Sequence, residues 1–241
     1  MAKIVRRHII NTVKQGYFKH NLLLYLCIAA VIFCAVLAFY TYGISLIIIP
    51  FLLVLIIRLK KQVGILLAGV KGEENTLETL SLLPDVYFVI CDVTLCVKNK
   101  TAQIDYIVVG PTGIFIIECK NLSGSICGNV NDRYLYKTKN LSNSSYERKE
   151  IYNPLFQVAT HSKLLSELLF EKKIYNIVSG CVYFSSPKAE VNLSGSCNIS
   201  VFSKSQRGDN KLLDFICQGK KEKLTPRQIK RIKNYIFSHC K

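Results

Sequence analysis

The chain has 241 residues, half of them hydrophobic, and carries 32 Lys and Arg against 16 Asp and Glu, a formal net charge of +16. Residues 1–61 hold eight of the basic residues and no acidic one, so the excess divides between two differently built regions. A run of 36 residues without a charged side chain, 22–57, excludes a chain that folds entirely as one soluble domain.

The uncharged run is too long for one membrane span. At about 1.5 Å per residue, a single helix would reach roughly 54 Å, against a hydrocarbon core of about 30 Å. Two tyrosines and Gly43 interrupt the aliphatic pattern at 40–43, and these residue types are typical of a break at the membrane interface. The sequence therefore predicts a transmembrane helical hairpin in the lipid bilayer, with spans at 22–40 and 44–59.

Basic residues flank the run on both sides, and they predict its orientation. Because positive charge is retained on the cytoplasmic face, residues 1–21 and 62–241 are both expected in the cytoplasm, as parts of a multi-pass membrane protein. A single tilted span is one alternative. A secretory signal peptide is another, although the basic sequence at 58–61 is not a small-residue cleavage site. The cysteines after the run show no CxxC pair and no zinc-ligand spacing, which favours reduced thiols.

Residues 62–241 have the length of one domain with its own core, which we place at about 70–190. Hydrophobic spacing predicts a mixed α/β sheet flanked by helices. One helix is expected at 75–83, before Pro84, and another at 153–170, where Asn153 and Pro154 suit an N-cap and the first helical position. The other expected elements are strands at 86–90, 93–97 (with a bend at 91–92), 103–109, 114–120, 134–137, 177–184 and 199–202, and a basic helix at 226–237.

Three charged side chains interrupt the most hydrophobic pair of strands. Asp105, Glu118 and Lys120 stand where a structural strand would carry Val or Ile, and buried charge is costly unless it is paired or bound to metal. If Gly110 and Gly113 close a tight turn, antiparallel pairing places Asp105 opposite Glu118, with Cβ atoms about 5 Å apart. Lys120 falls on the same face because side chains alternate along a strand.

This arrangement allows two interpretations. Neighbouring carboxylates repel unless a cation lies between them, and hard oxygen ligands suit Mg²⁺ or Mn²⁺. The lysine could orient or deprotonate a water, or stabilise charge on a phosphate, which is chemistry for phosphodiester hydrolysis. The alternative is a structural network on a half-exposed sheet, since a register shift of one residue would move Asp105 to the other face.

The residues that carry this pattern resemble the nuclease-related domain (NERD) family, over about 70–190. The matching segments are Gly72-Glu73, the block from Gln103 to Gly124 that contains Asp105, Glu118 and Lys120, and Asn153-Pro154-Leu155 with Gln157. The family is similar to PD-(D/E)xK nucleases, so the resemblance implies a restriction-endonuclease-like fold that cleaves nucleic acid, with DNA favoured, using Mg²⁺ or Mn²⁺.

The resemblance also implies roles for single residues. Asp105, Glu118 and Glu73 would be metal ligands, Lys120 the catalytic lysine, and Gln157 a contact from the later helix. Two positions depart from the family pattern. Tyr106 replaces a frequent histidine, and Cys119 stands where threonine is frequent, but neither change removes an implied ligand.

Four expectations qualify this site. Tyr106 is expected in the core or an interface, because it points away from Asp105 along the strand. Glu73 could instead be an acid that favours a helix N-terminus. Gln157 and His161 share a helix face, with His161 expected at the surface or beside the ligands rather than as a ligand. The basic residues after 219 could contact phosphate, face solvent or approach anionic lipid.

The rival function is a non-catalytic module that keeps the nuclease fold and binds nucleic acid or a protein at the membrane. Intact Asp105, Glu118 and Lys120 favour the enzyme. No pattern in the sequence indicates an oligomeric state.

Overall fold

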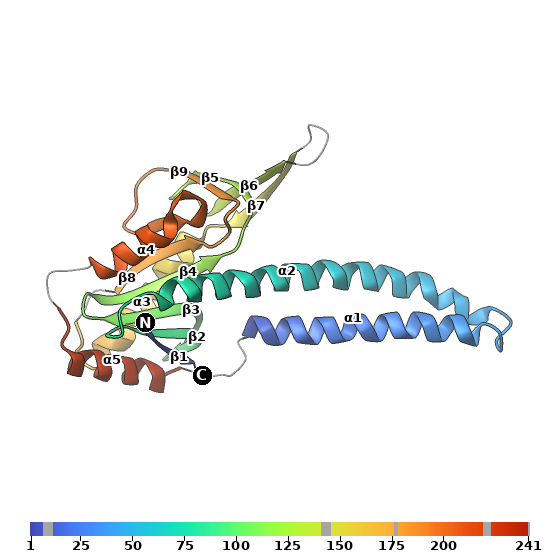
Figure 1. Cartoon of the computed structure of the whole chain (residues 1–241), viewed down its shortest axis with the longest axis horizontal. Helices are drawn as coiled ribbons and strands as arrows, with labels where there is room; N and C mark the ends of the chain where they lie inside the picture. The colour runs from blue at the N-terminus through green and yellow to red at the C-terminus, as the bar shows by residue number, and fades with distance from the viewer. Residues whose placement is uncertain (7–11, 141–145, 176–177, 219–222, 241) are drawn as a thin grey trace. The chain divides into compact units, whose positions relative to one another are not determined.

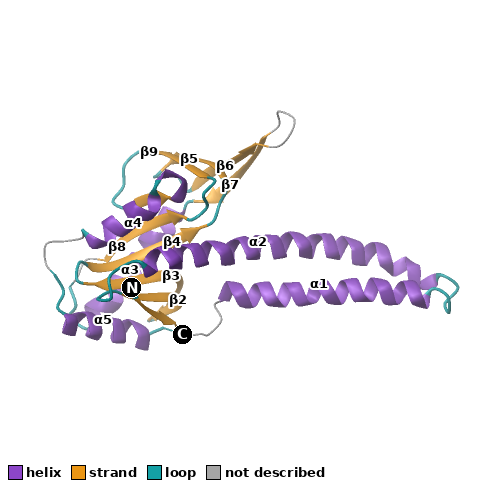
Figure 2. Cartoon of the chain, in the orientation of Figure 1, coloured by secondary structure: helices purple, strands orange, loops and turns teal. Residues whose placement is uncertain are grey.

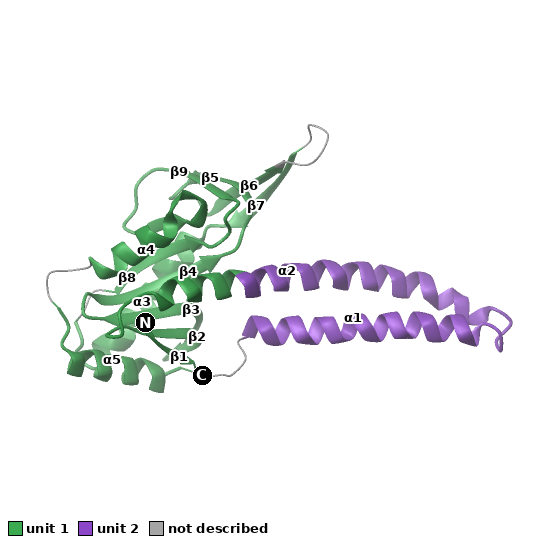
Figure 3. Cartoon of the chain, in the orientation of Figure 1, with its two compact units in different colours: residues 1–9, 72–241 green, residues 10–71 purple. Residues whose placement is uncertain are grey.

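The chain divides into two compact units, Ile10–Lys71 and the combination of Met1–Ile9 with Gly72–Lys241 (Figure 3). The structure is a computed structural model that describes residues 1–6, 12–140, 146–175, 178–218 and 223–240. The division differs from the predicted one at both boundaries. Residues 62–71 belong with the hairpin, and the N-terminal residues, expected to precede the domain as a basic tail, belong to the domain itself.

The smaller unit is a helical hairpin. Its elements are α1 (Thr12–Leu37), the short 3-10 helix η1 (Ile44–Ile48) and the first part of α2 (Ile49–Ser81). Tyr42 and Gly43 have positive φ angles of 49° and 83° in the turn between the helices, which confirms the predicted break. The two helices pack through a small apolar cluster of Leu24, Cys27, Ile56 and Leu59.

Only one helix of the described residues, α1, is long and apolar enough by length and composition to cross a membrane. The apolar residues of the predicted second span, 44–59, are divided between η1 and the start of α2. The same helix then continues through Arg58, Lys60 and Lys61, which lowers its hydropathy. The structure therefore contains a helical hairpin, of which only the first helix qualifies as a span by length and composition.

The larger unit is built on a six-stranded mixed sheet, as the sequence predicted (Figures 1 and 2). The strand order is β1-β2-β3-β4-β8-β10, in which β2, β3 and β4 are antiparallel and the other pairs are parallel. The strands are β1 (Lys3–Arg6), β2 (Phe88–Val97), β3 (Lys100–Gly110), β4 (Gly113–Lys120), β8 (Val178–Phe184) and β10 (Ser200–Ser203).

Helices cover both faces of this sheet. One face packs on α3 (Pro154–Glu171) and α5 (Pro226–Ser238), through Leu165, Leu169 and Ile232 among others. The other face packs on the end of α2, through Leu80 and Leu83, and on α4 (Gly208–Cys217). The strand interiors therefore read as continuous apolar runs, because a sheet buried on both sides has no polar face.

The predicted helix starts are confirmed by their caps. The side chain of Asn153 accepts a hydrogen bond from the Leu155 N–H at 3.0 Å, and Pro154 occupies the first helical position of α3. Thr225 and Gln228 form a capping box at the start of α5. The helix expected at 75–83 is the last part of α2, so Glu73 lies inside a helix and not at its N-terminus.

A second sheet was missed by the sequence analysis, apart from one strand expected at 134–137. Its order is β7-β6-β5-β9, and its strands are β5 (Gly124–Asn129), β6 (Tyr134–Asn140), β7 (Tyr146–Tyr152) and β9 (Ala189–Ser194). The polar, glycine-containing sequence of this region resembles loops, and only the packing of Ile126 and Leu135 against α3 and β8 gives it a core.

Candidate functional site

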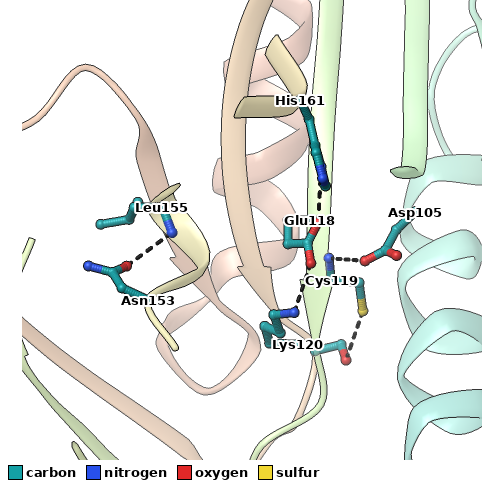
Figure 4. A network of polar contacts seen from close by, with 8 residues as sticks. Asp105, Glu118, Cys119, Lys120, Asn153, Leu155 and His161 are labelled. Atoms are coloured by element: carbon teal, nitrogen blue, oxygen red, sulfur yellow. Dashed lines mark hydrogen bonds and ion pairs between the residues drawn. The ribbon is translucent and has the colours of Figure 1, made fainter. Parts of the chain in front are cut away.

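The site forms where the ladder between β3 and β4 ends. Pairing runs in the predicted register from Gly110↔Gly113 to Tyr106↔Ile117 and then stops. The predicted next pair, Asp105 with Glu118, is absent from the ladder. Instead, the Cys119 N–H donates a hydrogen bond of 2.8 Å to Oδ2 of Asp105 (Figure 4). The carboxylate thus takes a place that a backbone carbonyl would fill in a regular ladder.

The ladder on the other side of Asp105 is interrupted as well. Between β2 and β3 the pairing passes from Cys91↔Tyr106 to Val93↔Ile104, so that the pair between Asp92 and Asp105 is missing from the ladder. Asp92 has a φ of 45°, an uncommon value for a non-glycine residue. Its Oδ1 accepts a hydrogen bond from Gln103 Nε2 at 2.8 Å. The bend predicted at 91–92 is confirmed, and the irregular backbone lies next to Asp105.

Glu118 is the most buried acid of the site, with 4% of its surface exposed. Lys120 Nζ donates to its Oε1 at 2.7 Å, which compensates part of the cost of burying the carboxylate. The second oxygen, Oε2, has no hydrogen-bond partner and lies 3.6 Å from Nδ1 of His161 (Figure 4). A buried carboxylate oxygen without a donor is uncommon and is typical of a position that a cation or water completes.

His161 comes from α3 and is buried against Glu118. Its pKa is lowered, chiefly by burial; the Glu118 charge opposes the shift and the Lys120 charge adds to it. The neutral ring is therefore favoured. The sequence predicts that His161 shares a helix face with Gln157 and lies at the surface or beside the ligands, but it does not predict which residue His161 contacts. The contact with Glu118 depends on how α3 crosses the sheet, and no local pattern contains that information.

Asp105 has a pKa raised to about 8, first by burial and second by the charge of Glu118. The Cys119 N–H and the Lys120 charge act in the opposite direction. Glu73 also raises this pKa, so its carboxylate lies close enough to act on Asp105 through charge. The charges of Glu118 and Glu73 therefore both act on Asp105, and that of Glu118 has the larger effect.

The two residues that depart from the family pattern are structural. The Tyr106 hydroxyl donates to the Glu73 carbonyl at 2.6 Å, and its ring is buried, as expected for a core position. The Cys119 thiol contacts the Thr76 hydroxyl at 2.9 Å, and burial raises its pKa to about 12. Through these contacts, both side chains join β3 and β4 to α2.

Gln157 lies in the first turn of α3, where the Asn153 cap orients the helix. Gln157 and Lys120 share a pocket of about 340 Å³. Its lining is Lys120, Leu122, Ile151, Tyr152, Pro154 and Gln157. Gln157 and Lys120 thus face the same open space, and this space is bordered by β7 of the second sheet through Ile151 and Tyr152.

The donor atoms fit a hard divalent cation in kind but do not form a preassembled cage. Among the residues that the structure describes, no three His, Cys, Asp or Glu side chains lie together as a metal site. Asp105 and Glu118 nevertheless present carboxylate oxygens, one of them without a partner. Mg²⁺ needs no more than this, because it usually keeps several waters and binds through one or two carboxylates together with substrate phosphates.

Comparison with known proteins agrees with the geometry. The nuclease-related domain family matches the chain over residues 68–185. An uncharacterized protein of Bacillus anthracis is 33% identical over 109 residues, which cover 44% of this chain and 48% of that protein, so the chain spans about half of its length. No solved structure matches the chain. Residues 68–185 of this chain are a nuclease-related domain and belong to the NERD family.

Proposed function

We propose that the chain is a membrane-anchored, Mg²⁺- or Mn²⁺-dependent nuclease that hydrolyses phosphodiester bonds in nucleic acid, with DNA favoured. One observation carries this proposal. Asp105, Glu118 and Lys120 converge where the β3–β4 ladder ends, and one buried oxygen of Glu118 has no hydrogen-bond partner. The family match supports a nuclease-like fold. A restriction-endonuclease-like arrangement of the catalytic residues is part of the proposal.

Each residue would have a distinct role. Asp105 and Glu118 would hold the cation, and Glu73 would add negative charge from α2. When bound, the cation would polarise a phosphoryl oxygen and lower the pKa of a bound water. The Lys120 ammonium, 2.7 Å from Glu118, would be oriented by that carboxylate toward the phosphate or the attacking water. Gln157 would contact the substrate from the shared pocket.

The non-catalytic alternative is supported by a specific contact. Lys120 already neutralises Glu118, and no three-ligand cluster is present among the described residues. A site in which the ion pair is permanent would bind nucleic acid or a protein without cleaving anything. The two functions differ in whether a divalent cation can enter beside Glu118.

An activity assay on the full chain in detergent separates them. Single- and double-stranded DNA are incubated with and without Mg²⁺ or Mn²⁺, using wild type, Asp105→Asn, Lys120→Ala and, as a control, Lys211→Ala at an exposed position of α4. Loss of the lysine should reduce cleavage by about 10²–10⁴-fold, as for removal of an acid–base group, with Lys211→Ala unchanged. If both Asp105→Asn and Lys120→Ala still cleave DNA, the proposed nuclease site is wrong. If the wild type binds DNA but shows no metal-dependent cleavage, the non-catalytic function is correct.

The proposed anchor is the helical hairpin, with both flanks in the cytoplasm. β1 pairs in parallel with β2, so the residues before and after the hairpin belong to one folded unit. A chain that crosses the bilayer through α1 must therefore cross back before Gly72. Basic residues on both sides of the apolar run predict that this unit lies on the cytoplasmic side. The pairing of β1 with β2 therefore favours two spans over a single tilted one.

A further inference from the structure

A two-stranded ribbon formed by β6 and β7 carries several exposed aromatic side chains, one of which, Tyr152, lines the pocket beside Lys120. The two strands pair antiparallel from Tyr134↔Tyr152 to Asn140↔Tyr146, and β7 is the edge of the second sheet. β5 covers β6 only between residues 136 and 138, so the ribbon continues beyond its neighbour (Figure 2). One face of an edge ribbon of this kind is available to a partner.

The alternation of side chains sorts the ribbon into two faces. Leu135 and Ile151 point inward, to the apolar cluster beneath the second sheet. The even-numbered residues therefore share the outward face. They include Tyr134, Tyr146 and Tyr152, with 44%, 68% and 46% of their surfaces exposed. We name this set, together with Tyr136, the tyrosine face.

Contacts between rings and cations organise the tyrosine face. The rings of Tyr134 and Tyr152 are 6.1 Å apart in an edge-to-face arrangement. The Arg148 guanidinium lies 3.9 Å above the ring of Tyr136, which confirms that both belong to one face. Tyr152 also lies 6.5 Å from the half-exposed ring of Phe156 on α3. The aromatic row thus runs from the ribbon onto the helix that carries Gln157.

The charge of the ribbon favours a negatively charged partner. The cations that contact the tyrosine face are Arg148, over Tyr136, and Arg133, which lies 5.8 Å from the ring of Tyr134; Glu150 is the acid on this face. Lys137, Lys139, Lys149 and Glu147 fall on the opposite face of the ribbon, and the ribbon as a whole has five basic residues and two acids between 133 and 152. Exposed aromatic rings interleaved with cations are the usual surface for single-stranded nucleic acid, because unpaired bases stack on the rings while the cations contact the phosphates. Bases in a duplex are stacked inside the helix and offer no free face to these rings.

The tyrosine face connects directly with the candidate site. Tyr152 lines the same pocket as Lys120 and Gln157. We propose that the tyrosine face binds single-stranded nucleic acid and directs the strand to Lys120. Cleavage of the bound strand at Lys120 rests on the proposed function. Binding of the strand to the tyrosine face does not depend on cleavage.

Binding without metal tests the proposal on the full chain in detergent. Fluorescent oligothymidylate, oligouridylate and a DNA duplex of equal length are titrated in EDTA, so that no strand is cut. Tyr134→Ala, Tyr146→Ala and Tyr152→Ala should each weaken single-strand binding by about five- to 150-fold and leave duplex binding unchanged. Tyr→Phe at the same positions should bind as wild type, since the stacking ring remains.

Tyr175→Ala is the matched control, because Tyr175 is an exposed tyrosine that also contacts another ring, Phe170, away from the ribbon. Its single-strand affinity should equal that of wild type. The proposed role of the tyrosine face would be wrong if all three ribbon Ala variants bound single strands with wild-type affinity. It would also be wrong if the variants lost equal affinity for duplex and for single strands. The thymidylate and uridylate titrations show whether DNA or RNA is the preferred strand.

The two proposals fail in different ways. If Mg²⁺-dependent cleavage is absent but single-strand binding depends on the tyrosines, the nuclease is wrong and the tyrosine face stands. If cleavage depends on Asp105 and Lys120 but the tyrosine variants bind and cleave normally, the nuclease stands and the tyrosine face is wrong.

Discussion

Asp105 is held in a setting that disfavours its charged form in the absence of a cation. Burial and the Glu118 charge raise its pKa to about 8, well above the usual 3.8. Between these values the folded chain keeps a proton that the unfolded chain has lost. Stability should therefore fall as pH rises through this range, since the native state binds more protons than the unfolded state. A divalent cation would reverse the effect, because it stabilises the carboxylate.

This predicts a distinctive pH dependence for Asp105→Asn. Relative to this variant, wild type should lose thermal stability as pH is raised from about 5 to about 8, and Mg²⁺ should restore it. Circular dichroism can follow the unfolding of the full chain in detergent, which suits a protein without tryptophan. Parallel profiles for the two proteins in EDTA would show that Asp105 titrates normally.

At the scale of elements, α3 decides the geometry of the site because it carries both Gln157 and His161. Its N-terminus is held by the fully buried Asn153. Besides capping the helix, the Asn153 amide donates to the Val130 and Asp132 carbonyls, at 3.1 and 2.8 Å. One side chain therefore fixes α3 to the loop that enters β6.

Asn153→Ala should be more costly than loss of an ordinary cap. A cap contributes about 1 kcal/mol, and leaving buried carbonyls without donors adds about 1–3 kcal/mol, so we expect a loss of about 2–4 kcal/mol in the free energy of unfolding. Thr225→Ala, which removes the exposed cap of α5, should cost about 1 kcal/mol. Urea denaturation measures both; equal losses would contradict the anchoring role of Asn153.

The close approach of α3 to β8 gives a second prediction. A Cβ at Gly180 would lie 2.2 Å from Val158 Cγ1, so Gly180→Ala must shift the Val158 side chain or the helix that carries it. Overpacking of this kind costs about 1–3 kcal/mol, and a shift of about 1 Å can reduce a rate about 10²-fold. We therefore expect the cleavage rate to fall by about 10²-fold, while the free energy of unfolding falls by only about 1–3 kcal/mol. Adding Val158→Ala makes room for the methyl group and should restore activity; a double variant as inactive as Gly180→Ala would reject this explanation.

At the scale of the whole molecule, β1 makes the domain discontinuous in sequence, with the hairpin inserted between β1 and the rest. The edge strand is short, four residues from Lys3 to Arg6. Its pairing with β2 requires both flanks of the hairpin to remain on one side of any membrane that α1 crosses.

Cysteine labelling in sealed vesicles checks this topology. An impermeant maleimide should reach Lys3→Cys and the exposed native Cys197 from the same side. Tyr42→Cys, in the fully exposed turn, should react only from the opposite side, in a background where Cys127, Cys197 and Cys217 are Ser. Labelling of Lys3→Cys and Cys197 from opposite sides would contradict a folded β1. Labelling of Tyr42→Cys from the domain side would reject the membrane crossing.

The sequence by itself determined the features that depend on local pattern. The asymmetry of charge and the uncharged run identify the hairpin, and its break at 40–43 follows from tyrosine and glycine. The turn between Gly110 and Gly113 sets the register of β3 and β4 correctly up to Tyr106↔Ile117. Both long helices of the domain begin at their predicted caps. These signals are strong because each arises among neighbouring residues.

Only the tertiary structure decided what lies around Asp105 and Glu118. The ladder ends one pair earlier than its register implies, because the Asp105 side chain takes the Cys119 N–H. His161 reaches Glu118 from a helix that follows it by 36 residues in sequence. The polar sequence around Tyr134 becomes a sheet only by packing on α3 and β8, and β1 pairs with a strand beyond the hairpin. Contacts between distant segments are set by how the whole chain packs, which no local pattern encodes.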